Sequence, residues 1–363
     1  MSDNNQNRIK AISLYKPPIR KKLQSKAYEF WGDNNLLPQE LLVYFLNDPF
    51  HGGIINKKVV YTTAKNVIEP SLDKVELRTI HNLINALAWD YWLYGGFSLQ
   101  IISNSVTKQI SQILHQKADA VRLGIKDNNI KYYISADWRV STEASTPYND
   151  YFFGDHTQPE FLFIKNYTPG FIFYPIPTYF QGTKDIDTNI NLTSWRLSLV
   201  LNSFVPGGLL YLPFPATDSA MMEQIKKEIE NLSGPASAGK IVTVFGDDTR
   251  QAAYTPFAAS PLSANSQKEL ISIVRENILI AHGIPHKAII GLDTTASLGG
   301  DANSLLIASN EFFDKQIMPV QNLILDTLNE LYSLKYSREI NLTLEQNYLS
   351  FYLNEQVNKS TMV

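Results

Sequence analysis

The sequence predicts an α+β fold in which long amphipathic helices bracket short strands. Apolar residues recur at helical spacing over residues 73–94, 185–205, 266–281 and 303–334, and short β-like runs fill much of residues 97–134. The 363 residues are 44% hydrophobic and 18% charged, an ordinary globular composition that allows two or three cores. We therefore expect a folded chain of several parts.

Composition excludes several classes of protein. The net charge of −3 lacks the basic excess of a protein that neutralises many phosphates, so any contact with DNA should be loose or local. The absence of cysteine excludes disulfides, thiolate catalysis and iron–sulfur clusters. No stretch approaches roughly 18 uninterrupted apolar residues, and the first residues are polar. We expect neither a membrane span nor a signal peptide.

Residues 1–36 are expected to form an N-terminal arm. Its basic residues are interrupted by Pro17 and Pro18, which cannot continue a helix. Such an arm could strap a neighbouring subunit or shell, or it could be a solvated tail. Helical patterns begin near Leu37 and near Ile54, and a longer one over residues 73–94 ends at two glycines.

Short strands separated by polar turns should follow this helix. Residues 97–102, 109–114, 121–125 and 130–134 are consistent with an antiparallel meander, and further strands are expected at 161–164 and 171–174. The aromatic residues of this region resemble a platform for nucleic-acid bases, but packing in a core is the commoner use of such side chains. We therefore interpret as core residues Tyr91, Trp92, Tyr94, Tyr132, Tyr133 and Trp138.

The second half reads as two long helices around a small αβ insertion. The helices cover residues 185–205 and 266–281, and a strand, a helix and a strand lie between them near residues 209–212, 218–232 and 240–245. A glycine-rich segment then leads into a helix of about thirty residues, 303–334. Pro319 lies inside this pattern and predicts a kink or a junction of two helices.

The common catalytic motifs are missing from the sequence. It contains no GxxxxGK[ST], GxGxxG, GxSxG or HExxH motif. His282 and His286 flank a glycine and a proline, which prevent the one-face geometry of a paired metal site, so we interpret them as helix-end histidines. Asp247 and Asp248 lack a third carboxylate at a suitable spacing. We expect no enzyme activity, no metal and no cofactor.

The order of these elements resembles the portal (head–tail connector) proteins of tailed double-stranded DNA bacteriophages. The resemblance is carried by FVPGGLL at 204–210, GPASAGKIVTVF at 234–245, IAHGIPHKAIIG at 280–291 and the helix over 312–331. The second segment is similar to a family turn of Asn or Ser, Ala, Gly and Lys that enters a strand, and the third to the family's "fgVPp-llG" segment. GGFSL at 95–99, followed by short strands, fits the family's wing domain.

The resemblance implies an organisation like that of portal proteins. A wing of helices and an antiparallel meander would cover residues 37–184, and a two-helix stem would cover 185–206 and 251–286. The remaining parts would be a small αβ clip over 207–250, a channel loop over 287–302, a long kinked wing helix over 303–334, and a small crown or C-terminal tail over 335–363.

Portal proteins of this family usually assemble as twelve-subunit rings at one capsid vertex. The resemblance therefore implies a homododecameric ring around double-stranded DNA, for genome packaging and head–tail connection. Further implied partners are the major capsid protein, the terminase large subunit and head-completion or adaptor proteins. The expected location is the virion, with assembly in the host cytoplasm.

Two sets of site residues follow from the resemblance. The clip should dock the terminase motor and adaptors through Lys226, Lys227 and Glu230. The channel loop should touch DNA weakly, because small polar residues and glycines allow movement and its acids repel phosphate. The loop residues concerned are Lys287, Asp293, Thr294, Thr295, Ser297, Asp301 and Asn303.

Two other functions remain open from the sequence. A metal-dependent nucleic-acid enzyme would use Asp247, Asp248 and distant acids with Mg²⁺, and metal-dependent cleavage would identify it. A cytosolic scaffold protein without a DNA role would behave as a monomer in solution. A ring is favoured because two stem helices with a clip at their tip bury too little surface to be stable alone, so their apolar faces need neighbours.

Overall fold

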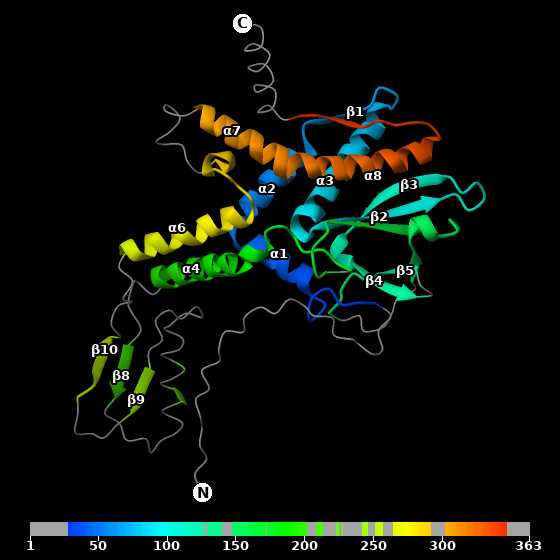
Figure 1. Ribbon diagram of the computed structural model, residues 1–363. Helices are drawn as coiled ribbons and strands as arrows, with labels where there is room; N and C mark the ends of the chain where they lie inside the picture. The colour runs from blue at the N-terminus through cyan, green and yellow to red at the C-terminus, as the bar shows by residue number, and fades with distance from the viewer. Residues whose placement is uncertain are drawn as a thin grey trace. The chain divides into compact units, whose positions relative to one another are not determined.

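The computed structural model (Figure 1) describes residues 28–126, 129–139, 147–171, 173–201, 208–212, 223–224, 227, 242–245, 251–256, 264–291 and 302–346. The chain divides into two units, each formed from separate segments. The first unit comprises residues 1–43, 59–177 and 318–363, and the second comprises residues 44–58 and 178–317. Helices α1 (Leu37–Asn47) and α2 (Pro49–Thr63) contribute residues to both units.

Helix α3 (Lys74–Tyr94) is the longest helix among the described residues of the first unit, and its ends are set by local sequence. Asp73 caps the N-terminus by accepting hydrogen bonds from the backbone N–H groups of Val75 and Glu76 at 2.9 and 2.8 Å. Gly95 ends the helix with φ 85°, a conformation that favours glycine. The helix contacts strand β2 and helix α8 (Met318–Tyr336). The helix predicted over residues 73–94 is confirmed.

The strands of the first unit form two three-stranded antiparallel sheets. One has the order β3-β2-β7, with β2 (Gly96–Ser103), β3 (Ile110–Gln116) and β7 (Glu160–Lys165). The other has the order β4-β5-β6, with β4 (Val121–Lys126), β5 (Asn129–Ile134) and β6 (Tyr148–Asn149). The hairpins β2–β3 and β4–β5 match the expected antiparallel pairs.

The continuous meander expected from the sequence is wrong at the step from β3 to β4. These two strands belong to different sheets, and the 3₁₀ turn η1 (Ala118–Ala120) joins them. The Ala118 N–H donates to the buried Asp90 carboxylate at 2.9 Å, and His115 Nε2 lies 2.8 Å from the same oxygen. A carboxylate on α3 therefore fixes the turn that takes the chain from one sheet to the other.

The predicted core interpretation of the aromatic residues is confirmed. Each of the six is at most 8% exposed. Trp92 Nε1 donates to Thr62 Oγ1 at 2.8 Å and Tyr132 donates its hydroxyl to Asp150 Oδ2 at 2.6 Å, so the polar atoms of these buried rings are paired.

Residues 28–36, which we expected in the arm, pack into the first unit instead. Trp31 is 1% exposed and stacks on Tyr174 with ring centroids 4.7 Å apart. The Arg122 guanidinium is buried between the Trp31 and Trp138 rings, 5.6 and 4.8 Å from their centroids, and donates to the Asn35 carbonyl oxygen at 2.7 Å. Residues 1–27 lie outside the described part of the chain.

The strand expected over residues 171–174 is wrong. Residues 173 and 174 form a bend, and residue 172 lies outside the described chain. The Tyr174 hydroxyl accepts from the Leu123 N–H at 2.6 Å and donates to the Glu29 carbonyl oxygen at 2.7 Å. Contacts between the Tyr174 side chain and the core hold this segment. The same alternation of apolar residues occurs in strands, so the sequence pattern alone could not separate the two structures.

The chain returns to the first unit after α8. Strand β11 (Thr343–Glu345) pairs antiparallel with β1 (Asn66–Ile68), and Glu345 accepts hydrogen bonds from the Lys65 and Asn66 side chains at 3.1 and 2.6 Å. Residues up to 346 of the expected crown or tail therefore pack on this unit. Residues 347–363 lie outside the described chain.

The second unit contains the antiparallel helices α4 (Thr183–Leu201) and α6 (Ala264–Ala281), which lie side by side in Figure 1. A 3₁₀ turn, η3 (Phe180–Gly182), precedes α4. The close approach of the helix ends requires a glycine, because a Cβ on Gly182 would lie 2.6 Å from the Ala281 Cβ. Asn277 Nδ2 donates to Asp185 Oδ1 at 3.1 Å and links the helices one turn further along.

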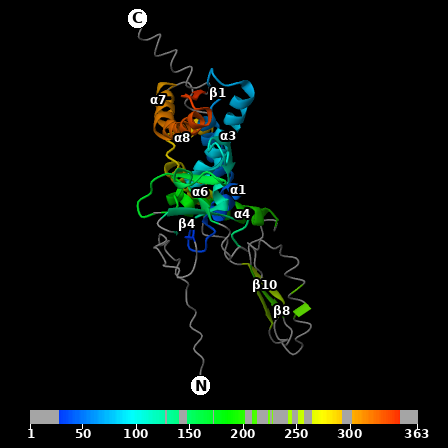
Figure 2. The same ribbon diagram turned by 90° about the vertical axis from the view of Figure 1, so that its right-hand side faces the viewer.

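A three-stranded sheet of order β10-β8-β9 belongs to the second unit. Strand β8 (Gly208–Leu212) is parallel to β9 (Val242–Phe245), a pairing that needs a crossover, and residues 223, 224 and 227 between them are helical. This confirms the strand–helix–strand order. Strand β10 (Ala253–Pro256) pairs antiparallel with β8, and the two lie side by side in Figures 1 and 2.

Strand β10 corrects the boundary drawn from the sequence. We placed its residues with the second stem helix, but its pairing of Ala253 with Tyr211 puts them in the insertion. The four residues AYTP end in proline and carry little strand signal of their own.

The long helix near the C-terminus is interrupted just before Pro319, as predicted. Helix α7 (Ala302–Phe312) passes into a π-helical turn, η5 (Phe313–Ile317), and α8 begins at Met318. Pro319 therefore lies in the first turn of α8, where a missing N–H is tolerated. The predicted junction of two helices is confirmed.

Candidate channel and assembly surfaces

A buried polar cluster lies where α6 ends. His51 and His282 are almost fully buried, and His51 Nδ1 lies 2.9 Å from His282 Nε2, so one nitrogen donates and the other accepts. Lys58 is also buried and donates from Nζ to the His282 carbonyl oxygen at 2.7 Å. The Tyr179 ring lies 4.5 Å from the His51 ring and 5.0 Å from the His282 ring, centroid to centroid. The cluster joins α2, the turn before α4 and the end of α6.

Burial favours the neutral forms of these side chains. Burial, assisted by the charge of Lys58, lowers the pKa of His51 to about 3 and holds the pKa of His282 well below its ordinary value of 6.5. Burial also lowers the pKa of the Lys58 ammonium from 10.5 to about 7. Both histidines are therefore neutral at pH 7.

Sequence reasoning missed this cluster, although a signal for it was present. His51, Ile54, Ile55 and Lys58 recur at the spacing of one helix face. A lysine on an otherwise apolar stripe is seldom buried without a partner, so it points to a polar contact inside the core. The identity of that partner, 224 residues away along the chain, came only from the fold.

A second buried contact fixes the start of α2 on α4. Asn189 Nδ2 donates to Asp48 Oδ1 at 2.9 Å, and the same oxygen accepts from the Phe50 N–H at 2.9 Å. Burial raises the pKa of Asp48, while the hydrogen bonds from Phe50 and Asn189 act in the opposite direction. Together with the histidine cluster, this contact holds both helices of the pair on one short segment of chain.

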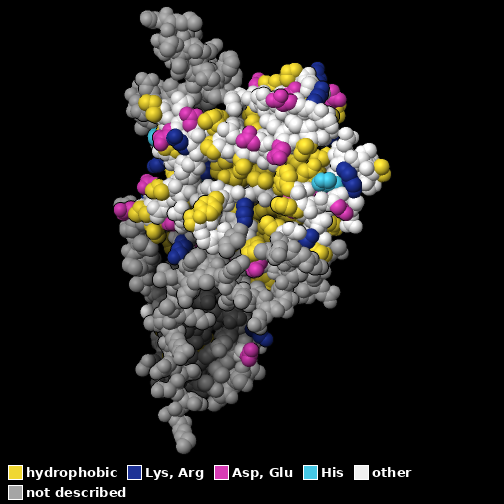
Figure 3. All heavy atoms as spheres, turned by 45° about the vertical axis from the view of Figure 1, so that its right-hand side comes forward, with side chains coloured by type: hydrophobic (Ala, Val, Ile, Leu, Met, Phe, Trp, Pro, Cys, Tyr) yellow, Lys and Arg dark blue, Asp and Glu magenta, His cyan; other side chains and the backbone are white. Residues whose placement is uncertain are grey.

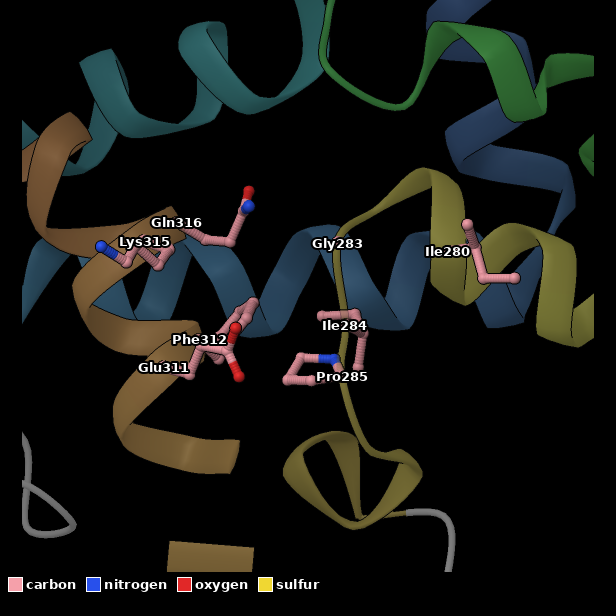
Figure 4. Close-up of a pocket in the computed structure, with 8 residues that line it drawn as sticks. All are labelled: Ile280, Gly283, Ile284, Pro285, Glu311, Phe312, Lys315 and Gln316. Carbon is pink, nitrogen blue, oxygen red and sulfur yellow. The ribbon is translucent and has the colours of Figure 1, made fainter. Parts of the chain in front are cut away.

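The connection after α6 forms one wall of a surface hollow of about 240 Å³. In Figure 4, Ile284 and Pro285 of this connection face Phe312 and Glu311 of α7 across the hollow, and Ile280 projects from α6. Gly283 has φ 65°, a left-handed backbone conformation that favours glycine at this point of the connection.

The interpretation of His282 and His286 as helix-end residues is confirmed. His282 follows the last residue of α6, and His286 caps the 3₁₀ turn η4 (Lys287–Ile290) by accepting from the Ala288 N–H at 3.1 Å. Gly291 ends this turn with φ 80°.

The structure describes two of the predicted channel-loop residues. Lys287 begins η4 with its side chain 47% exposed, and its Nζ lies 3.8 Å from Glu276 Oε1 on α6. Asn303 lies in the first turn of α7. The other five predicted residues lie outside the described chain: Asp293, Thr294, Thr295, Ser297 and Asp301.

The structure describes one of the predicted docking residues of the insertion. Lys227 is helical and exposed, whereas Lys226 and Glu230 lie outside the described chain. Asp247 and Asp248, considered above as metal ligands, also lie outside it. The sheet of the insertion exposes two apolar side chains, Val244 on β9 and Tyr254 on β10.

The described surface carries charges of both signs. On the face shown in Figure 3, Lys and Arg side chains are interspersed with Asp and Glu rather than gathered into one basic surface. No group of three His, Cys, Asp or Glu side chains able to hold a metal ion occurs among the described residues. Likewise, no described helix is long and apolar enough to cross a membrane.

Comparison with known proteins agrees with the resemblance noted in the sequence. No family model matches the chain. Over 299 residues the chain is 22% identical to the probable portal protein of Haemophilus phage HP1, an alignment that covers 82% of this chain and 80% of that protein.

Solved structures share the fold. A chain from the neck of a native gene transfer agent particle, computed with C12 symmetry, matches with a TM-score of 0.58 and 18% identity, covering 90% of this chain and 89% of that one. A chain from the neck of the empty particle, computed with C6 symmetry, matches with a TM-score of 0.59 at the same identity and coverage. The resemblance to phage portal proteins and the α+β fold are confirmed.

The buried histidines should make stability fall in mild acid. The unfolded chain binds protons at both histidines below about pH 6.5, whereas the folded chain resists protonation until a much lower pH. We expect each buried neutral histidine to reduce the free energy of unfolding by about 1.4 kcal/mol per pH unit below pH 6.5. Urea unfolding between pH 7 and pH 4.5 measures this slope.

Replacing both residues, with His51→Gln and His282→Gln together, should flatten the slope in that range, because glutamine keeps hydrogen-bonding capacity without titrating. The control is His286→Gln at an exposed position, which should follow the parent curve. Parallel curves for the parent and the double variant would show that the cluster does not control acid stability.

Proposed function

We propose that this chain is a portal subunit, copies of which form a ring at one capsid vertex of a tailed bacteriophage, with double-stranded DNA passing through the ring. The observation that carries the proposal is the similarity to a probable portal protein over 82% of the chain. The shared fold with neck chains of gene transfer agent particles supports it. The proposed role is mechanical and needs no bond-making chemistry.

In this proposal the ring has twelve copies, and the C12 symmetry of the matched neck supports a rotational assembly. Helices α4 and α6 form the stem, the sheet β10-β8-β9 belongs to the clip, and the first unit forms the wing. Further proposed partners are the major capsid protein, the terminase large subunit and head-completion or adaptor proteins. The proposed location is the virion, after assembly in the host cytoplasm.

The charge of the chain suits a channel through which DNA slides. Strong binding of many phosphates would hold DNA in place and depend steeply on salt. A net charge of −3, with charges of both signs interspersed on the face shown in Figure 3, supplies no such grip. Weak contacts from single cations such as Lys287 would allow DNA to move in both directions.

Purified protein should form closed rings with a central pore. Negative-stain images should show the pore, and light scattering should give a mass near twelve times 41.1 kDa. A stable monomer at micromolar concentration, with no rings even when the chain is co-expressed with shell and scaffolding proteins, would count against the proposal.

We also propose that the segment containing residues 291–300 lines the channel. Lys287 lies in η4 and Asn303 in α7, so the segment between them can be shortened without removing either element. Deleting five residues between Gly291 and Gly300 should leave rings intact and reduce the packaging or retention of DNA, measured as nuclease-protected DNA per particle. Particles with the same protected DNA as the parent would make the segment a simple connector.

The clip is proposed to dock the packaging motor. Lys227 is exposed on its helix and Lys226 and Glu230 are close to it in sequence. Reversing both lysines, with Lys226→Glu and Lys227→Glu, should leave rings intact and impair packaging, because docking charges act mainly on association. Arg139→Glu, at an exposed position of the first unit, is the control. Packaging at the parental level by the clip variant would remove this assignment.

A further inference from the structure

Helix α6 presents three distinct faces. Val274 and Ile278, four residues apart, are buried and mark the face that packs into the second unit. Ile273 and Ile280 are seven residues apart, about two helical turns, so they share a second face. Residues 268, 272, 275 and 279 recur at spacings of four, three and four and share a third. The second and third faces lie on opposite sides of the buried one.

The third face contains a hollow of about 280 Å³, here called the cationic hollow. Phe50, Ile271 and Leu279 supply its apolar lining, and Lys268, Arg275 and Lys287 supply its positive charge. The Arg275 guanidinium lies 5.4 Å from the Phe50 ring centroid, and Lys287 pairs with Glu276 at 3.8 Å. Three cations and one carboxylate leave the hollow positively charged.

The second face carries what we call the apolar ridge, formed by Ile273, Ile280 and the acid Glu269. Ile273 is 49% exposed and Ile280 is 75% exposed. Glu269 is exposed one turn before Ile273 on the same face. A single exposed isoleucine is ordinary, but two on one stripe with an acid beside them match an apolar hollow rimmed by cations.

We propose that the apolar ridge of one copy packs into the cationic hollow of the next copy around the ring. This inference rests on the proposed function, which supplies the rotational assembly. A ring needs two different, complementary surfaces on each copy, and α6 carries one on each side of its buried face. Burial of Ile273 and Ile280 would provide stability, and Glu269 beside Lys268 would select the register.

The positions of the two surfaces along α6 favour this contact. Each ridge residue directly follows a residue of the hollow face in the sequence, so the two differ in height along the helix by about 1.5 Å. The pairs are 268 and 269, 272 and 273, and 279 and 280. Rotation of one copy about an axis parallel to α6 therefore brings Glu269 level with Lys268 and Ile280 level with Leu279. Phe50, Leu279 and Glu276 make the hollow a poor site for DNA phosphates, the other occupant that its cations suggest.

The first test compares rings of the parent and of ridge variants. Ile273→Asp and Ile280→Asp should each abolish rings in negative-stain images and reduce the mass in light scattering to that of a monomer or short oligomer. Val75→Asp is the matched control, because Val75 is also 75% exposed on a helix but lies in the first unit. Circular dichroism spectra at low temperature should keep the parental helix content in all three variants, since every replaced side chain is on the surface, whereas the ridge variants should melt earlier because they lose the stabilisation of the ring.

Charge exchange tests the register. Glu269→Lys should raise the protein concentration needed for ring formation at least tenfold. Adding Lys268→Glu to the same chain should bring that concentration back to the parental value, because the two changes together recreate an opposite-charge pair. Rings that persist in the ridge and charge variants would overturn the inference and leave the proposed function standing. If Lys268→Glu instead leaves rings intact and reduces DNA packaging, the hollow binds DNA, and this outcome would also overturn the inference.

Cross-linking tests the contact directly, because the chain has no cysteine of its own. A variant with Ser272→Cys and Ile273→Cys should give, under oxidation, a ladder of linked copies on a denaturing gel. Either cysteine alone should give no more than trace dimer, since the two surfaces differ. Strong dimers from Ile273→Cys alone, or rings without a ladder, would overturn the inference. A parent chain that forms no rings would instead refute the ring itself and the proposed function with it.

Discussion

The second unit depends on the burial of a lysine and two histidines at the base of its helix pair. Such groups are costly to bury unless each finds a partner. The contacts of Lys58 and His51 with His282 supply those partners and join segments that are more than 200 residues apart. These contacts fix the point where α6 ends. The turn η4, and with it Lys287, is placed as a consequence.

This anchoring leaves much of α6 for other uses. Val274, Ile278 and Leu279 of this helix are buried within the described part of its own unit. Ile273 and Ile280 remain exposed on one side of the helix, and a positively charged hollow lies on the other. A helix pair of this kind gains little by remaining alone and gains apolar burial by meeting copies of itself.

The sequence predicted those elements whose signals are local. Asp73 and Gly95 marked the ends of α3, Gly283 marked the end of α6, and Pro319 marked the junction near η5. It failed where the outcome depended on distant residues. The turn between β3 and β4 is held by Asp90 of α3. Tyr174 is held by hydrogen bonds in the core and not by pairing with a strand. Strand β10 forms because its backbone pairs with β8.

The sequence by itself determined the α+β class, the order of helices and strands, the core role of the aromatic residues and the resemblance to portal proteins. Helix periodicity, capping residues and segment order are all local properties of a chain, and these conclusions rest on them. Only the tertiary structure brought His51 to His282 and placed the hollow and the ridge on opposite sides of α6. Those arrangements combine residues from separate segments, and the energies that select them, burial and pairing of polar groups, arise only when the segments meet.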